Sequence, residues 1–255
     1  MSSTLVLGIL EQGLVYGIMA LGVYLTFRVL NFPDLTVDGS FTLGGAIAAA
    51  MIVAGHRPAV ATLVAVLGGL AAGAATGLLH TRLRVSGLLA GILTMTALYS
   101  VNLRVMGRSN VPLLRRETLI TQVESLWASP WTTLLFLLVA GLAVKLLLDW
   151  FLQTEYGLAI QATGDNPAMI RSLGVDTDQA VLVGLALSNG LVALSGALVA
   201  QYQGFADVGM GIGMIVAGLA SVILGQALVR ARGVFFGTLA ALIGSILYRA
   251  AAGAA

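Results

Sequence analysis

Residues able to do chemistry are few, because only 9% of the 255 residues are charged. One stretch, NFPDLTVDGSFTLGG (31–45), nevertheless places Asp34 and Asp38 with a proline and glycines between two apolar segments. Carboxylates at such a break are costly in a membrane unless they are solvated, paired or capping a helix. The stretch is therefore either a surface loop between membrane helices or part of a substrate gate.

The sequence argues against an enzyme. The chain has no cysteine, which excludes disulfides and thiolate metal sites, and its two histidines, His56 and His80, stand apart. Lys145 is the single lysine and lies inside an apolar segment, so there is no phosphate-binding GxxxxGK[ST] motif. We expect Lys145 to snorkel toward the membrane surface. We expect no catalytic residue, cofactor or metal, and the net charge of +2 gives no indication of nucleic-acid binding.

Composition identifies a membrane protein. Apolar residues make up 58% of the chain and the mean hydropathy is +0.98, whereas soluble domains carry roughly 25% charged residues. A spanning helix needs about 20 mostly apolar residues. The sequence therefore predicts one all-α, polytopic transmembrane bundle over residues 1–255, with about eight spans. The predicted spans are 4–27, 38–54, 58–79, 88–106, 131–151, 179–200, 212–229 and 234–247.

Two connections are long. Residues 107–130, which we place outside the cytoplasm, predict a short interfacial helix with Trp127 and Trp131 at the lipid headgroups. Residues 152–178, which we place in the cytoplasm, predict two helices separated by a turn at 165–167. The second helix would run over 167–173 and end at Gly174. The distribution of arginines does not decide this orientation.

Several polar residues could line a transport pathway. Thr94 and Thr96 lie in the fourth span, and Ser188 and Asn189 lie in the sixth. For each of the four, hydrogen bonding between helices is the alternative role. Within 31–45, Asp38 precedes Gly-Ser and is expected to cap the second span, whereas Asp34 has no such role. The candidates for the pathway are Phe32, Asp34, Ser40, Thr42, Thr94, Thr96, Ser188 and Asn189.

Glycine patterns indicate close packing. Gly69, Gly73 and Gly77 recur every four residues, which lets helices approach within the chain or at a dimer seam. A second glycine-rich interruption, QGFADVGMGIGMIVAG (203–218), resembles 31–45 and would be inverted relative to it in the membrane. Paired interruptions of this kind mark transport sites in inverted-repeat transporters; chance in a glycine-rich sequence is the alternative.

The segment EYGLAIQATGDNPAMIRSLGVDTDQAVLVGLALSNGLVALSGALVAQYQG (155–204) closely resembles permeases of ABC importers of the branched-chain amino acid and ribose type, and VAGLASVILGQAL (216–228) resembles their penultimate span. FRVLNFPDLTVDGSFTLGGAIAA resembles a subgroup linked to uptake of aromatic amino acids or related small solutes. The resemblance implies a type II importer-like permease that forms a homodimer in the lipid of the bacterial inner membrane. Its implied partners are a separate ATPase and an extracytoplasmic solute-binding protein.

The same resemblance implies that the region 157–174 contacts the ATPase. The residues implied in this coupling are Ala162, Gly164, Asp165, Asn166, Pro167, Met169, Arg171 and Gly174. Members of the subgroup usually continue into one further span, whereas this sequence stops at AAAGAA, so a ninth helix is left open. The rival hypothesis is an ion-driven secondary transporter that uses Glu11, Asp34 or Asp207.

Overall fold

A computed structural model describes residues 3–126, 129, 131–229 and 233–254 of the chain. In the described part of the chain, the regular secondary structure is helical apart from one short ribbon of two strands. The elements are α1 (Ser3–Tyr24), the π-helix η1 (Leu25–Val29), α2 (Thr36–Val53), α3 (Pro58–Thr81), α4 (Gly87–Met106), β1 (Asn110–Pro112), α5 (Leu119–Leu126), α6 (Thr132–Leu152), α7 (Glu155–Asp165), α8 (Pro167–Ser172), α9 (Thr177–Gln203), β2 (Phe205–Asp207), α10 (Met214–Leu228) and α11 (Val234–Ala254).

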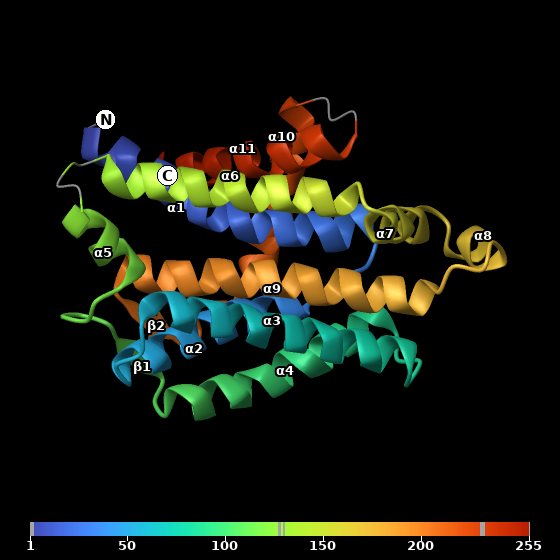
Figure 1. Ribbon diagram of the computed structural model, residues 1–255, viewed down its shortest axis with the longest axis horizontal. Helices are drawn as coiled ribbons and strands as arrows, with labels where there is room; N and C mark the ends of the chain where they lie inside the picture. The colour runs from blue at the N-terminus through green and yellow to red at the C-terminus, as the bar shows by residue number, and fades with distance from the viewer. Residues whose placement is uncertain (1–2, 127–128, 130, 230–232, 255) are drawn as a thin grey trace.

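The long helices run side by side along one axis (Figure 1). Among the described residues, seven helices are long and apolar enough to cross a membrane, and α10 is a shorter apolar helix. This confirms the all-α polytopic fold, although the last helix, α11, is much longer than its predicted span. The short helix expected within 107–130 is present as α5, while Trp127 lies outside the described residues.

α9 occupies the middle of the bundle, between α1, α6, α10 and α11 on one side and α2, α3 and α4 on the other (Figure 1). At one end, which we call the ribbon end, β1 pairs antiparallel with β2. The helices α7 and α8 project at the opposite end, which we call the α7 end (Figure 1). The sequence did not predict the ribbon, because its strands have three residues each and are far apart in the chain.

The glycine stripe on α3 serves packing within the chain. A Cβ atom at Gly73 or Gly69 would collide with the backbone of α9, and one at Gly77 would come within 3.0 Å of the Leu182 Cα atom. The three glycines thus let α3 lie directly against α9, as small residues do in membrane bundles. The stripe is a helix–helix contact of one subunit, which is the first of the two alternatives.

Gly44 on α2 provides a test of this packing. A Cβ atom there would collide with the backbone of Ala193 on α9, whereas a Cβ atom at Gly141 on α6 would meet nothing within 4 Å. Gly44→Ala should destabilise the protein by about 1–3 kcal/mol through overpacking. Gly141→Ala should leave the thermal unfolding midpoint in detergent unchanged or slightly higher. Equal midpoints for the two variants would contradict the described packing.

The two glycine-rich interruptions meet inside the bundle. Residues 30–35 lead from the α7 end into α2, which runs on to contact the ribbon, and Pro33 lacks the amide hydrogen that a continuous helix would need. Residues 208–213 lead from the ribbon into α10, whose last turn reaches the α7 end at Gln226. Gly211 lies directly against Asp38. Two helices that start at interruptions therefore extend in opposite directions from one point of contact.

Candidate functional site

Asp34 is fully buried and lies two residues before the start of α2. Its Oδ1 atom accepts a hydrogen bond from the backbone N–H of Thr36 at 2.9 Å, and its Oδ2 atom accepts one from Nδ2 of Asn189 at 2.7 Å. Asn189 lies near the middle of α9. Both carboxylate oxygens are therefore occupied by donors, and one of these donors is the N–H of the first residue of α2.

Asp38 does not cap the second span, which corrects the expectation. α2 already begins at Thr36, so Asp38 lies in its first turn. Its two carboxylate oxygens accept hydrogen bonds from the backbone N–H groups of Gly213, at 2.9 Å, and Ile215, at 2.8 Å. These amides belong to the start of α10, where a carboxylate is favoured by the helix dipole. Asp38 thus joins α2 to α10 across the two interruptions.

A cavity of about 240 Å³ opens beside Asp38, and we call it the Asp38 cavity. α2, α4 and the segment before α10 form its walls. The residues lining it are Asp38, Gly39, Thr42, Met95, Thr96, Tyr99, Asn102, Val208 and Ile212. Of the eight pathway candidates, the structure brings only Thr42 and Thr96 to this cavity.

The sequence contained a signal for the α4 wall that was missed. Thr96, Tyr99 and Asn102 are spaced three residues apart, which places them on one face of a helix. Of these three residues, only Thr96 is among the pathway candidates predicted from the sequence. The hydroxyl of Thr96 donates to the carbonyl oxygens of Ile92 and Leu93 on its own helix.

Ser188 and Asn189 form hydrogen bonds with other segments of the bundle. The Ser188 hydroxyl donates to the carbonyl oxygen of Gly22 on α1 at 2.7 Å, and Asn189 donates to Asp34. Both side chains are fully buried. Their side chains therefore hold segments of the bundle together, and they do not line the Asp38 cavity.

The remaining pathway candidates lie elsewhere. Phe32 packs edge-on against His80, with 5.1 Å between ring centroids. Ser40 is buried, and its hydroxyl has no partner among the described residues. The Thr94 hydroxyl donates to the carbonyl oxygen of Ala90 in its own helix. The eight candidates therefore do not form one site.

Helix α8 is held rigidly at the α7 end. The Asn166 side chain accepts a hydrogen bond from the N–H of Met169 at 3.0 Å, and proline at the first position of the helix suits this cap. At the other end, Arg171 donates to the Thr177 hydroxyl at 2.6 Å and forms an ion pair with Asp178 at 3.3 Å. Among the residues implied in coupling, Asn166 and Arg171 therefore have partners within this chain.

Two large apolar side chains are exposed at α8. Met169 is 54% exposed, and Leu173, directly after the helix, is 70% exposed. Gly174 follows with φ of 87°, a left-handed conformation that ends the helix and suits glycine. In α7, by contrast, Gly164 packs against the Val29 carbonyl and has no room for a side chain. Hence α7 contacts the bundle, while α8 and the residue after it expose the apolar side chains of Met169 and Leu173.

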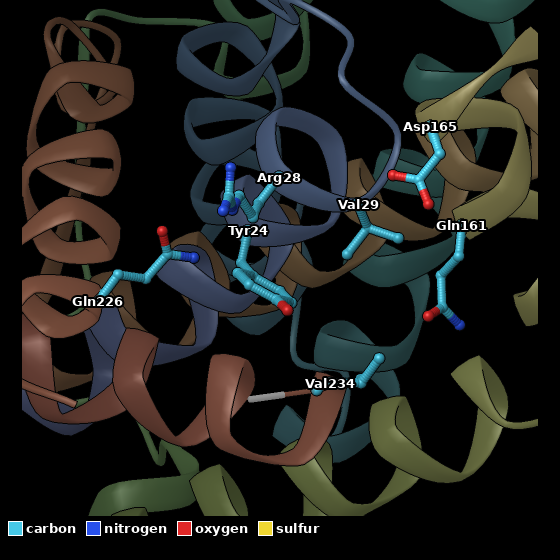
Figure 2. A pocket seen from close by; sticks show the side chains of 8 residues that line it. Tyr24, Arg28, Val29, Gln161, Asp165, Gln226 and Val234 are labelled. Atoms are coloured by element: carbon cyan, nitrogen blue, oxygen red, sulfur yellow. The ribbon is translucent and has the colours of Figure 1, made fainter. Parts of the chain in front are cut away.

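A second, polar cavity of about 480 Å³ lies beside α7, and we call it the Arg28 cavity. Figure 2 shows Asp165 and Gln161 of α7 on one side of it and Arg28 and Gln226 on the other, with Tyr24 between them. Arg28 belongs to η1, a π-helical turn of a kind that is frequent at functional sites. The cavity therefore lies between α7 on one side and α1 and α10 on the other. Because α7 forms one wall, the shape of the cavity depends on the position of α7.

Lys145 does not snorkel to the surface, contrary to expectation. It is 2% exposed and forms an ion pair with Asp149, which is 5% exposed and lies one helical turn further along α6. Asp149 also accepts a hydrogen bond from Thr238 of α11 at 2.6 Å, and the ammonium of Lys145 lies 3.5 Å from the ring centroid of Phe235. The pair thus joins α6 to α11, and the spacing of four residues was the sequence signal for it.

The carboxylates of the rival hypothesis are each bonded within the fold. Glu11 accepts a hydrogen bond from the Tyr202 hydroxyl at 2.9 Å. Asp207 accepts bonds from the Gly209 N–H, at 2.8 Å, and from Asn110, at 3.3 Å. In the part of the chain that the structure describes, no three His, Asp or Glu residues are grouped so that they could hold a metal ion.

The chain is similar to known permease proteins. The family described as the permease component of branched-chain amino acid transport systems matches residues 5–255. A tyrosine transport system permease protein of Clostridioides difficile is 43% identical, covering 96% of this chain and 80% of that protein. An uncharacterized protein of Rickettsia prowazekii is 36% identical, covering 85% of this chain and 75% of that protein.

More distant relatives have the same kind of description. An autoinducer 2 import system permease protein of Salmonella paratyphi B is 26% identical over 82% of this chain. The aligned region spans only 59% of that relative's length. No solved structure matches the chain.

Proposed function

Because the chain belongs to the permease-component family of branched-chain amino acid transport systems, we propose that it carries an amino acid or a similar small solute across the bacterial inner membrane. The chain is a multi-pass permease subunit of an ABC importer, and ATP hydrolysis belongs to a separate subunit. The family match over almost the whole chain carries this proposal. The name of the Clostridioides difficile relative makes tyrosine the first solute to test.

The α7 end is the proposed cytoplasmic end, where two ATPase subunits would dock on a homodimer of this chain. The exposed face of Met169 and Leu173 supports this proposal, since a coupling helix must offer an apolar contact and stay rigid. The cap from Asn166 and the bonds of Arg171 supply that rigidity. An extracytoplasmic binding protein would deliver the solute at the ribbon end, and lipid would surround the assembly.

A substitution on α8 tests the docking surface. Met169→Glu places a charge on the proposed apolar contact and should weaken co-purification of the ATPase roughly tenfold. Leu114→Glu is the control, because Leu114 is also an exposed apolar residue but lies near the ribbon. If Met169→Glu retains the ATPase as well as Leu114→Glu does, α8 is not the docking surface.

The Asp38 cavity is proposed to form part of the translocation pathway. It lies where α2 and α10 meet, and interrupted helices of this kind form the binding sites of many transporters. Thr42 and Thr96 remain pathway candidates on this basis, joined by Tyr99 and Asn102. Driven by the ATPases, a movement of α10 relative to α2 would open the cavity to one side of the membrane and close it to the other.

A further inference from the structure

The Asp38 cavity has an unusual balance of polar groups. Asp38 is a carboxylate, and among the described residues that line the cavity there is no lysine, arginine or histidine. The backbone N–H groups of Gly213 and Ile215 donate one hydrogen bond each to its carboxylate oxygens. An ionised carboxylate offers about four acceptor positions, so Asp38 can still accept bonds from a ligand.

Asn102 supplies a second unused acceptor. Its side chain is 1% exposed, and its Nδ2 atom donates to the carbonyl oxygen of Gly39 at 3.2 Å. That bond fixes the orientation of the carboxamide, because the reversed group would set two oxygens against each other. The Oδ1 atom is left buried with no partner among the described residues. An unsatisfied buried acceptor is rare and costs free energy.

Both groups belong to the same small space. The Asn102 carboxamide bonds to α2 at Gly39, the residue next to Asp38, and all three residues line the cavity. The other polar lining groups are hydroxyls, which can also accept hydrogen bonds. Tyr99, which is half exposed, adds an aromatic ring able to contact a cation or another ring.

We propose that the Asp38 cavity binds the ammonium group of the transported solute, with the Asp38 carboxylate and Oδ1 of Asn102 as its acceptors. An ammonium group offers three donors and a positive charge, which complements a site of acceptors that lacks a cation. The site would select solutes that carry an amine, and Tyr99 would contact the remainder of the solute. This inference rests on the proposed function, since it names the solute class of the same pathway.

The selectivity of the unmodified protein tests the proposal first. The permease–ATPase complex in nanodiscs, without binding protein, is titrated with tyramine and with 3-(4-hydroxyphenyl)propionate, and binding is followed by saturation-transfer NMR. Both probes contain a phenol ring, but tyramine carries an amine and no carboxylate, whereas the propionate carries a carboxylate and no amine. Tyramine should bind and the propionate should not. Equal binding of the two probes, or binding of the propionate alone, or of neither, overturns the proposal.

Variants then locate the site. Asp38→Asn and Asn102→Leu should each weaken tyramine binding roughly tenfold, the effect of losing one bond to a charged group. Asn102→Leu leaves both bonds between Asp38 and α10 in place, so its effect is not a loss of the connection between α2 and α10. Asp207→Asn and Asn110→Leu are matched controls, because this Asp–Asn pair lies outside the cavity.

Unchanged binding in Asn102→Leu, or an equal loss in the two control variants, overturns the proposal. These binding measurements need no ATP hydrolysis. Their failure can therefore be told apart from a failure of the complex to import solute, which would contradict the proposed function itself.

Discussion

Replacing Lys145 with methionine should lower the free energy of unfolding by about 3–5 kcal/mol, the cost of leaving one member of a buried ion pair uncompensated. Asp149 would lose its cation while remaining almost completely buried beside Thr238. In a membrane bundle this appears as a lower yield of folded protein and a lower thermal unfolding midpoint in detergent. The same variant also removes the cation from the ring of Phe235.

The double variant Lys145→Met/Asp149→Leu is the control. Replacing both members of a buried pair with apolar residues of similar size is often neutral, and the Thr238 hydroxyl keeps its bonds to carbonyl oxygens of its own helix. The double variant should therefore recover most of the lost stability. A single variant as stable as the unmodified protein would show that the charge pair does not hold α6 to α11.

Asp34→Ala should destabilise the protein by roughly 2–4 kcal/mol, because it removes the acceptor of the Thr36 N–H and one of the two acceptors of Nδ2 of Asn189. Both groups are buried in the bundle. Asp34→Asn should have an intermediate effect, since one carboxamide oxygen can accept from Thr36 or from Asn189 but not from both at full strength. The measurement is again the thermal unfolding midpoint.

Transport by Asp34→Asn separates a structural role from a gating role. We expect the rate of uptake to fall in proportion to the amount of folded protein in the membrane, because both oxygens of Asp34 bond within the fold. A variant that folds at the normal level yet does not transport would contradict this account and restore Asp34 as a gate residue.

The architecture could largely be predicted from the sequence, because a membrane span is a local property. About twenty apolar residues in a row are recognisable wherever they occur. Pro58 predicts the start of α3 from local sequence alone, because proline favours the first turn of a helix. The turn at Asn166 and the end of α8 at Gly174 were likewise predicted from local capping rules. Even the two interruptions were visible as polar, glycine-rich breaks.

Contacts between distant segments could not be predicted in this way. Asp38 has a sequence neighbourhood that suits a cap of its own helix, yet its partners are Gly213 and Ile215. Nothing local to Asp38 distinguishes the two outcomes, because the choice depends on where α10 begins. Asp34 and Asn189 form a bond of the same kind, whereas the sequence alone gives them only as two separate pathway candidates.

The most direct test of the central claim is the energy source of transport. Proteoliposomes containing the permease, its ATPase and its binding protein are supplied with labelled L-tyrosine, with or without ATP and with or without a proton gradient. We predict that uptake needs ATP and the ATPase and continues when the proton gradient is dissipated. Accumulation of solute by the permease alone, driven by a proton gradient, would contradict the assignment to ABC importers.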